Sequence, residues 1–195
     1  MIEYEMKKYK ALNTLADKGG IVIFGDHEDC EIPLGELKQA LAWKDAIYNR
    51  SVSDLSVTNA IDYYKECITE LCPDTVLLHI GAMDMALFEE APSEFDQKYR
   101  ELITYIKALD KNCEIVVVSM KNYNEMAILT EMNKHLKYIA ESERCEFADI
   151  SSKRVWNPKQ TKEIVSFVYS IGFVQTLKNK RPIYDLVKFL FCYEA

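Results

Sequence analysis

Residues 21–24 of the chain are four consecutive β-branched or aromatic residues, and polar residues follow soon after them. An unbroken apolar run of this length is typical of a short strand that is covered on both faces. Gly25 ends the run and permits backbone conformations that other residues avoid, so it predicts a sharp turn. Asp26 and His27 then lie at the carboxyl end of the strand, where open α/β sheets bind their ligands. We expect the rest of the chain to be organised around this strand.

Short apolar runs alternate with amphipathic segments along the whole chain. The runs predict strands over residues 20–25, 46–49, 74–81, 114–119 and 146–150. The amphipathic segments predict helices over residues 1–18, 34–43, 53–71, 93–109, 124–142, 159–170 and 182–193. Ser53 and Ser93 are the expected N-caps of two of these helices. One face of the first helix, which we expect to be amphipathic, is approximated by Tyr4, Tyr9, Leu12 and Leu15.

The alternation of strand and helix predicts the fold class. Because parallel strands need right-handed crossovers, it indicates a three-layer α/β/α fold with a five-stranded parallel sheet. Five strands favour the flavodoxin-like order 2-1-3-4-5, and we expect one domain over residues 1–195. The strand order then reverses between the first and third strands. Asp26 and His27 on one side, and Gly81, Met83 and Asp84 on the other, are expected to flank a common crevice there.

Composition narrows the partners of the chain. The 195 residues carry 24 Lys and Arg against 31 Asp and Glu, a formal net charge of −7. An acidic surface disfavours nucleic acid and anionic membranes as partners. Residues 1–8 lack the apolar core of a signal peptide, and no apolar run approaches the ~20 residues of a membrane span. We therefore predict a cytoplasmic protein with no membrane partner.

The six cysteines are scattered without any Cys-x-x-Cys pair, so neither a zinc site nor a redox motif is predicted. We expect free, mostly buried thiols and no cofactor or metal. Near the carboxyl terminus, residues 183–193 are unusually apolar. As a helix they would pack one face on the sheet, while Phe189 and Tyr193 face outward. That outward face is a candidate surface for a homo-oligomer or another partner, although plain core packing is the favoured interpretation.

Three blocks of the sequence resemble the SGNH (GDSL-type) hydrolase family. Residues 19–27 read Gly-Gly-Ile-Val-Ile-Phe-Gly-Asp-His, residues 48–54 read Tyr-Asn-Arg-Ser-Val-Ser-Asp, and residues 73–84 read Pro-Asp-Thr-Val-Leu-Leu-His-Ile-Gly-Ala-Met-Asp. Their order and spacing match the family across about residues 1–150. The resemblance implies the SGNH-hydrolase fold and an ester hydrolase. In that family a serine after Gly-Asp attacks, a glycine and an asparagine of the later blocks hold the oxyanion, and a histidine of a fourth block is the base.

The chain departs from the family at the positions that carry this chemistry. The nucleophile position holds His27, the second-block glycine position holds Asp54, and the third-block asparagine position holds Met83. A thioether donates no hydrogen bond, and a carboxylate turned inward would repel an oxyanion. Residues 153–160, in the region of the fourth block, contain no Asp-x-x-His, and no histidine follows His135. The turn-forming positions of the family are retained as Gly25, Asp26, Gly81 and Asp84.

These losses decide the predicted function. Acyl transfer by serine needs a nucleophile, a base and oxyanion donors together. The sequence therefore favours a catalytically inactive SGNH-like protein with a binding or interaction role and an unknown ligand. One alternative is an esterase of small esters or acylated sugars whose site is rebuilt around His27, oriented by Asp26 or Asp84. Another alternative is a structural subunit of an oligomer.

Other polar residues near the crevice allow two interpretations each. Asp26, Asp54 and Asp84 are either a cluster for a hard cation or, as we favour, local acceptors of backbone N–H groups in turns. The possible substitute nucleophiles are Ser51, Ser53 and Cys30, of which Ser53 is better explained as an N-cap.

Further residues away from the crevice read as structural. His79 is expected to be a buried histidine with its hydrogen bonds satisfied, and His135 to be exposed. The spacing of Met120, Met126 and Met132 is typical of core faces.

Overall fold

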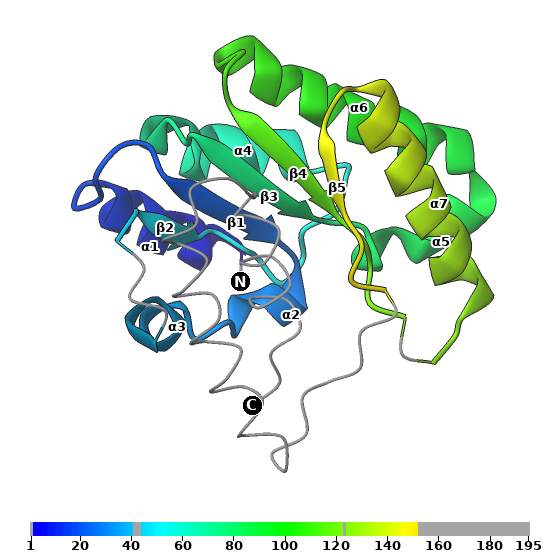
Figure 1. Cartoon of the computed structure of the whole chain (residues 1–195), viewed down its shortest axis with the longest axis horizontal. Coiled ribbons are helices and arrows are strands. Elements are labelled where there is room, and N and C mark those ends of the chain that lie inside the picture. The colour runs from blue at the N-terminus through cyan, green and yellow to red at the C-terminus, as the bar shows by residue number, and fades with distance from the viewer. Residues whose placement is uncertain (1, 41–43, 123, 152–195) are drawn as a thin grey trace, which may run out of the picture.

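The computed structural model of the chain describes residues 2–40, 44–122 and 124–151 (Figure 1). Its centre is a five-stranded, all-parallel sheet in the order β2-β1-β3-β4-β5, which confirms the predicted order. The strands are β1 Ile21–Gly25, β2 Ile47–Asn49, β3 Thr75–His79, β4 Glu114–Val118 and β5 Glu146–Ala148. β1 and β3 are paired along their full length, and the last pair in the register joins Gly25 to His79.

Helices occupy the connections between the strands. The α-helices are α1 Ile2–Asn13, α2 His27–Cys30, α3 Leu34–Ala40, α4 Ala60–Cys67, α5 Met85–Glu90, α6 Pro92–Leu109 and α7 Ala127–Ser142. Two short 3₁₀ helices, η1 Thr69–Leu71 and η2 Ala82–Asp84, precede β3 and α5. Because the crossover through α3 runs from β1 to β2 and the crossover through α4 runs back past β1 to β3, right-handed connections place α3 and α4 on opposite faces of the sheet.

The main hydrophobic core lies between one face of the sheet and the helices α1, α4, α6 and α7 (Figure 1). Alternate strand residues such as Val22, Phe24 and Leu78 point into it. Phe24 stacks on Tyr63 of α4 and meets Tyr64 edge-on, with ring centroids 6.0 and 5.7 Å apart. This packing fixes β1, and with it the polar residues that follow β1.

The structure corrects the expectation for the first helix. The helix ends at Asn13, and Tyr4, Leu12 and Leu15 are exposed by 74%, 43% and 85%. Of the four residues assigned to its face, Tyr9 alone is buried. The helix contacts α4 through a narrower stripe than its apolar residues indicate.

Neither serine predicted as an N-cap begins its helix. α4 begins at Ala60 after Asn59, because the Asn59 amide accepts from the Ser56 N–H (3.0 Å) and donates to the Asp54 carbonyl (2.9 Å), which holds the preceding segment in turns. α6 begins at Pro92, whose fixed φ and missing N–H suit the first position of a helix. The five strands, α3 and α7 keep their predicted order with bounds that differ by a few residues. The short helices α2, α5, η1 and η2 were not predicted as separate elements.

Several predictions lie outside the described residues: the helices over residues 159–170 and 182–193, the comparison of residues 153–160 with the fourth block, and the state of Cys192. A single domain over residues 1–195 therefore stays a prediction. In the parts of the chain that the structure describes, none of the helices combines the length and the apolar character needed to cross a membrane.

Candidate functional site

The candidate site lies at the carboxyl edge of β1 and β3, where the strand order reverses. Asp26 follows β1 directly, and Gly81 follows β3 after one residue. Gly81 has φ +140°, a conformation that side-chain-bearing residues rarely adopt, so the turn after β3 requires glycine. Gly25 is required for a different reason, since a Cβ atom there would lie 1.7 Å from Asp29 Oδ2.

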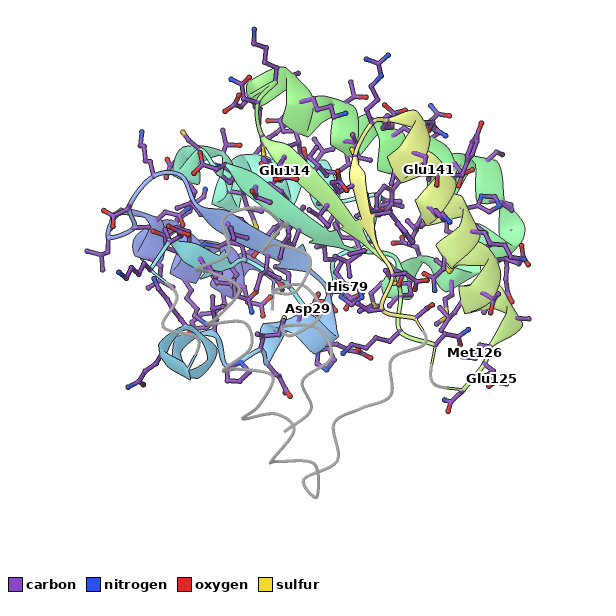
Figure 2. All side chains as sticks on the ribbon, viewed as in Figure 1. Asp29, His79, Glu114, Glu125, Met126 and Glu141 are labelled. Atoms are coloured by element: carbon purple, nitrogen blue, oxygen red, sulfur yellow. The ribbon has the colours of Figure 1, made fainter. Side chains whose placement is uncertain are left out.

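The centre of this edge is a buried pair of Asp29 and His79, which Figure 2 labels at the ends of α2 and β3. Asp29 Oδ2 lies 2.8 Å from His79 Nδ1, and the two side chains are exposed by 1% and 3%. Burial alone would lower the pKa of His79, but the charge and hydrogen bond of Asp29, with the charge of Asp26, raise it above its usual value. The prediction that His79 is buried is confirmed, and its Nδ1 is hydrogen-bonded to Asp29.

Two more buried carboxyl groups stand beside this pair. Asp26 is 2% exposed, and its Oδ2 accepts no hydrogen bond from the described residues. Burial raises the pKa of Asp26, and the negative charge of Asp29 raises it further, while His79 lowers it. Asp84 is 3% exposed, and burial raises the pKa of Asp84 to about 6. Burial at this edge of the sheet thus raises the pKa values of both carboxyl groups.

Asp84 also links the third sequence block to the loop that follows the second block. Its Oδ2 accepts a hydrogen bond of 3.0 Å from the backbone N–H of Val57. Val57 lies in the loop between β2 and α4. This bond spans 27 residues, so Asp84 is a long-range acceptor and not the local turn acceptor that the sequence predicts. Asp54 is exposed, whereas Asp26 and Asp84 are buried. Among the described residues, no three His, Cys, Asp or Glu side chains form a group that could hold a metal ion.

The second sequence block, residues 48–54, holds the end of β1 in place through hydrogen bonds. Ser51 is fully buried, and its Oγ accepts from the Gly25 N–H at 3.1 Å. Its carbonyl accepts from the hydroxyl of Tyr9 at 2.9 Å. The Arg50 guanidinium lies over the rings of Tyr9 and Tyr48, 4.9 and 5.3 Å from their centroids. Ser51 is therefore a structural residue and not a substitute nucleophile.

The three positions that depart from the family all face solvent. His27 is the first residue of α2 and is exposed, as is Asp54 in the loop after β2. Met83, in η2, is 53% exposed. At the places where the family has a hydroxyl and two oxyanion donors, this chain presents an imidazole, a carboxylate and a thioether.

The remaining candidate nucleophiles have structural roles in the described residues. Cys30 Sγ donates to the Asp26 carbonyl at 3.5 Å, and burial, with Glu5 next, raises the pKa of the Cys30 thiol to about 11. Such a thiol holds its proton at neutral pH and is a poor nucleophile. Ser53 Oγ lies 3.5 Å from Glu5 Oε1.

Two expectations away from the edge need correction. His135 is half-buried and not exposed, because its Nδ1 lies 2.9 Å from both oxygens of Asp96 and its ring meets Phe88 edge-on. Met120 and Met132 are core residues as predicted, but Met126 is 42% exposed. The cysteines within the described residues are free, and Cys72 is exposed.

Sequence reasoning missed Asp29, the residue that organises this edge. Its partner lies 50 residues away, so no local pattern connects the two. The usable signal was indirect: a histidine inside an apolar strand needs a buried partner. A glycine at the end of β1, four residues before an aspartate, is compatible with a close approach of that aspartate.

Solved structures share this architecture, whereas the chain matches no protein-family model and no curated protein sequence. A Streptococcus pneumonia protein named after platelet activating factor is 19% identical, with a TM-score of 0.63 over 76% of this chain and 74% of that protein. A GDSL-like lipase from Bacteroides thetaiotaomicron is 15% identical, with a TM-score of 0.56 over 95% and 94% of the two chains. A catalytic mutant of an acetylxylan esterase from Geobacillus stearothermophilus is 14% identical, with a TM-score of 0.56 over 85% and 97%. The chain has the SGNH-hydrolase fold, and at these identities the likeness shows the fold alone.

Proposed function

We propose that this chain keeps the SGNH-hydrolase fold without the serine-ester hydrolysis of that family, and that it acts by binding. The observation that carries the proposal is the residue after Asp26. At the end of β1, where the family has its attacking hydroxyl, stands His27, exposed at the start of α2. The fold alone does not assign a reaction, so the proposal depends on these side chains.

The positions of the histidines support the same proposal, because the hydrolysis also needs a general base. The chain has three histidines, and none follows residue 135. His79 is hydrogen-bonded to Asp29 inside the sheet edge, and His135 to Asp96 between α6 and α7. A base must reach the proton that it abstracts, and the His79 side chain, which is 3% exposed, is closed off from a substrate.

The size of the expected loss also favours binding over hydrolysis. Removing one oxyanion donor costs roughly 10²–10³ in rate. Without nucleophile and base, an otherwise intact site retains only about 10³–10⁴ over water. Here Met83 and Asp54 replace the family donors as well. A hydrolase of this kind would be too slow to detect against spontaneous hydrolysis of most esters.

An ester panel tests the proposal. Wild type and His27→Ala are assayed with p-nitrophenyl esters of increasing chain length and with acetylated sugars. We expect no turnover that depends on His27. Glu28→Ala is the matched control, because Glu28 is the exposed neighbour on the same short helix. A kcat/KM that falls at least tenfold in His27→Ala but not in Glu28→Ala would overturn the proposal.

That contrary result would establish the second candidate, an esterase of small esters or acylated sugars rebuilt around His27. Two observations favour it as the runner-up. The His27 side chain is open to solvent at the carboxyl edge of the sheet, where a substrate can reach it. A structural neighbour of this chain is an acetylxylan esterase.

A further inference from the structure

The outer side of α1 carries an apolar stripe that is open to solvent. Tyr4, Leu12 and Leu15 are all exposed, and Leu15 is exposed by 85%. Tyr4, Lys8 and Leu12 are spaced four residues apart, so they lie on one face of the helix. The Leu15 N–H donates to the Leu12 carbonyl at 3.1 Å, which continues the last turn and keeps Leu15 on the side of Leu12. We call these four residues the α1 stripe.

The α1 stripe is separate from the face that packs α1 on the protein. On that face Tyr9 is buried and donates its hydroxyl to the Ser51 carbonyl, and Asn13 Nδ2 donates to the Cys67 carbonyl at 2.8 Å. Met6 packs against the core on the same side. At 3.6 residues per turn, these packed positions point away from the stripe. Packing of the helix therefore leaves the stripe free, and a contiguous exposed apolar patch is a mark of an interaction surface.

The charge within the stripe is positive. Lys8 lies between Tyr4 and Leu12, and Lys7 lies beside the stripe. Neither lysine forms an ion pair in the described part of the chain. The exposed Glu3 lies on the far side of Lys7 from the stripe. The chain as a whole has a formal net charge of −7, so this surface differs in sign from the rest. It attracts an acidic partner.

The backbone of the stripe favours a helix as the occupant. An extended peptide binds by pairing with free backbone groups at a sheet edge, whereas the N–H and C=O groups of a helix are bonded internally. From Tyr4 to Leu15 the stripe is about 16 Å long at ~1.5 Å per residue, which is about three turns. A second helix with apolar side chains every three or four residues can pack along this length.

We propose that the α1 stripe binds an acidic amphipathic helix of another protein. The apolar side chains of that helix pack on Tyr4, Leu12 and Leu15. Carboxylates beside its apolar side accept hydrogen bonds from Lys7 and Lys8. The proposal specifies a partner for the binding role proposed above, and it uses none of the residues of the candidate site.

Other occupants match the stripe less closely. A symmetric contact between two copies of this chain would bring the Lys8 side chains together near the middle of the stripe, where like charges repel. An anionic membrane would be repelled by the net charge of −7.

Two synthetic peptides and the full-length chain test the assignment. Both peptides are amphipathic helices of about 18 residues, long enough to be helical, with leucine at every third or fourth position. One carries glutamate beside the leucines and the other carries lysine. Binding is followed by fluorescence anisotropy of the labelled peptides and by NMR chemical shifts of residues 2–15. We expect the acidic peptide to bind at least tenfold more tightly than the basic one, and its binding to weaken with added salt.

Variants of exposed residues locate the surface. Lys8→Glu should weaken binding of the acidic peptide at least tenfold, because an attraction becomes a repulsion. Leu15→Ala should weaken it severalfold, because apolar contact is lost. The matched controls are Lys111→Glu, in the turn before β4, and Tyr138→Ala, on α7. Both of these residues are exposed outside the stripe, so both controls should bind like the wild type.

Several results would overturn the proposal. It fails if the basic peptide binds as tightly as the acidic one, if Lys8→Glu or Leu15→Ala binds like the wild type, or if neither peptide shifts the resonances of residues 2–15. It also fails if light scattering finds a dimer that Leu15→Ala dissociates, or if the chain binds phosphatidylserine vesicles in a way that Lys8→Glu abolishes. Ester turnover is measured separately, so this proposal and the one on hydrolysis can fail independently.

Discussion

The described residues include two histidine–aspartate pairs that have nearly equal lengths and opposite surroundings. His79 and Asp29 lie 2.8 Å apart at the edge of the sheet and are exposed by 3% and 1%. His135 and Asp96 lie 2.9 Å apart between two helices and are exposed by 36% and 23%. Distance alone would rank the two pairs as equals. Burial separates them, because water screens the outer pair and cannot reach the inner one.

The comparison teaches what holds the carboxyl edge of this fold together. In an SGNH hydrolase, that edge carries the nucleophile and the oxyanion donors. In this chain the edge is occupied by the buried, hydrogen-bonded pair of His79 and Asp29 and by the buried carboxyl groups of Asp26 and Asp84. Groups that have lost contact with solvent cannot act on a substrate directly. The buried pair therefore connects α2 to β3, and its loss should lower the free energy of unfolding.

The largest expected effect comes from breaking the inner pair. Asp29→Ala leaves His79 buried without its carboxylate, which typically costs about 3–5 kcal/mol of unfolding free energy. Asp96→Ala is the matched variant in the outer pair and should cost below about 1 kcal/mol, because that pair is partly solvated. Urea unfolding of both variants at pH 7 gives the two values. Equal costs would refute the claim that burial, and not distance, separates the pairs.

The glycine that makes room for the inner pair gives an intermediate effect. Gly25→Ala places a methyl group 1.7 Å from Asp29 Oδ2, so Asp29 or the end of β1 must move. Overpacking of this kind costs about 1–3 kcal/mol. Gly35→Ala in α3 is the control, since nothing lies within 4 Å of its added Cβ, and alanine in a helix should be neutral or stabilising by up to about 1 kcal/mol.

A double variant sharpens this second prediction. If the methyl group acts through Asp29, then Gly25→Ala added to Asp29→Ala should cost much less than Gly25→Ala added to the wild type. Thermal or urea unfolding of the four proteins gives the coupling. Additive costs would mean that Gly25 is required for a reason other than the carboxylate beside it.

The sequence predicted the sheet well because each strand is encoded locally. Residues 21–24 form an apolar run that no helix pattern interrupts, and the same holds for residues 115–118. Helix starts were predicted less well because they depend on particular hydrogen bonds. Ser53 has the right chemistry for an N-cap, but the amide of Asn59 holds the turns before α4 instead. Propensity identified a helix there without locating its first residue.

The site could be predicted only as a set of positions. The resemblance to the SGNH blocks located His27, Asp54 and Met83, and the structure finds all three exposed. The buried part of the edge escaped prediction, because Asp29 acts on a histidine 50 residues away and Asp84 on a backbone N–H 27 residues away. Such contacts depend on the register of β1 against β3, which a sequence pattern does not specify. The sequence thus indicated which positions lack the side chains of the family. The buried groups that occupy the edge instead could be identified only from the structure.

Titration separates the buried carboxyl groups of this edge from the exposed ones. The pKa of Asp84 is raised to about 6 by burial, so the folded state binds more protons than the unfolded state between about pH 4 and pH 6. Stability must then fall as pH rises through this window, by up to about 1.4 kcal/mol per pH unit for this one group. Asp26 and His79, whose pKa values are also raised, add slopes of the same sign.

Asp84→Asn keeps an oxygen for the Val57 N–H but cannot ionise, so it should flatten the slope and be at least as stable as the wild type at pH 7. Urea unfolding of wild type, Asp84→Asn and the exposed control Asp62→Asn at half-unit steps from pH 4 to pH 8 measures the difference. A slope that is as steep in Asp84→Asn as in Asp62→Asn would show that Asp84 ionises in the folded protein as readily as it does in water, and that burial at this edge is less complete than its 3% exposure implies.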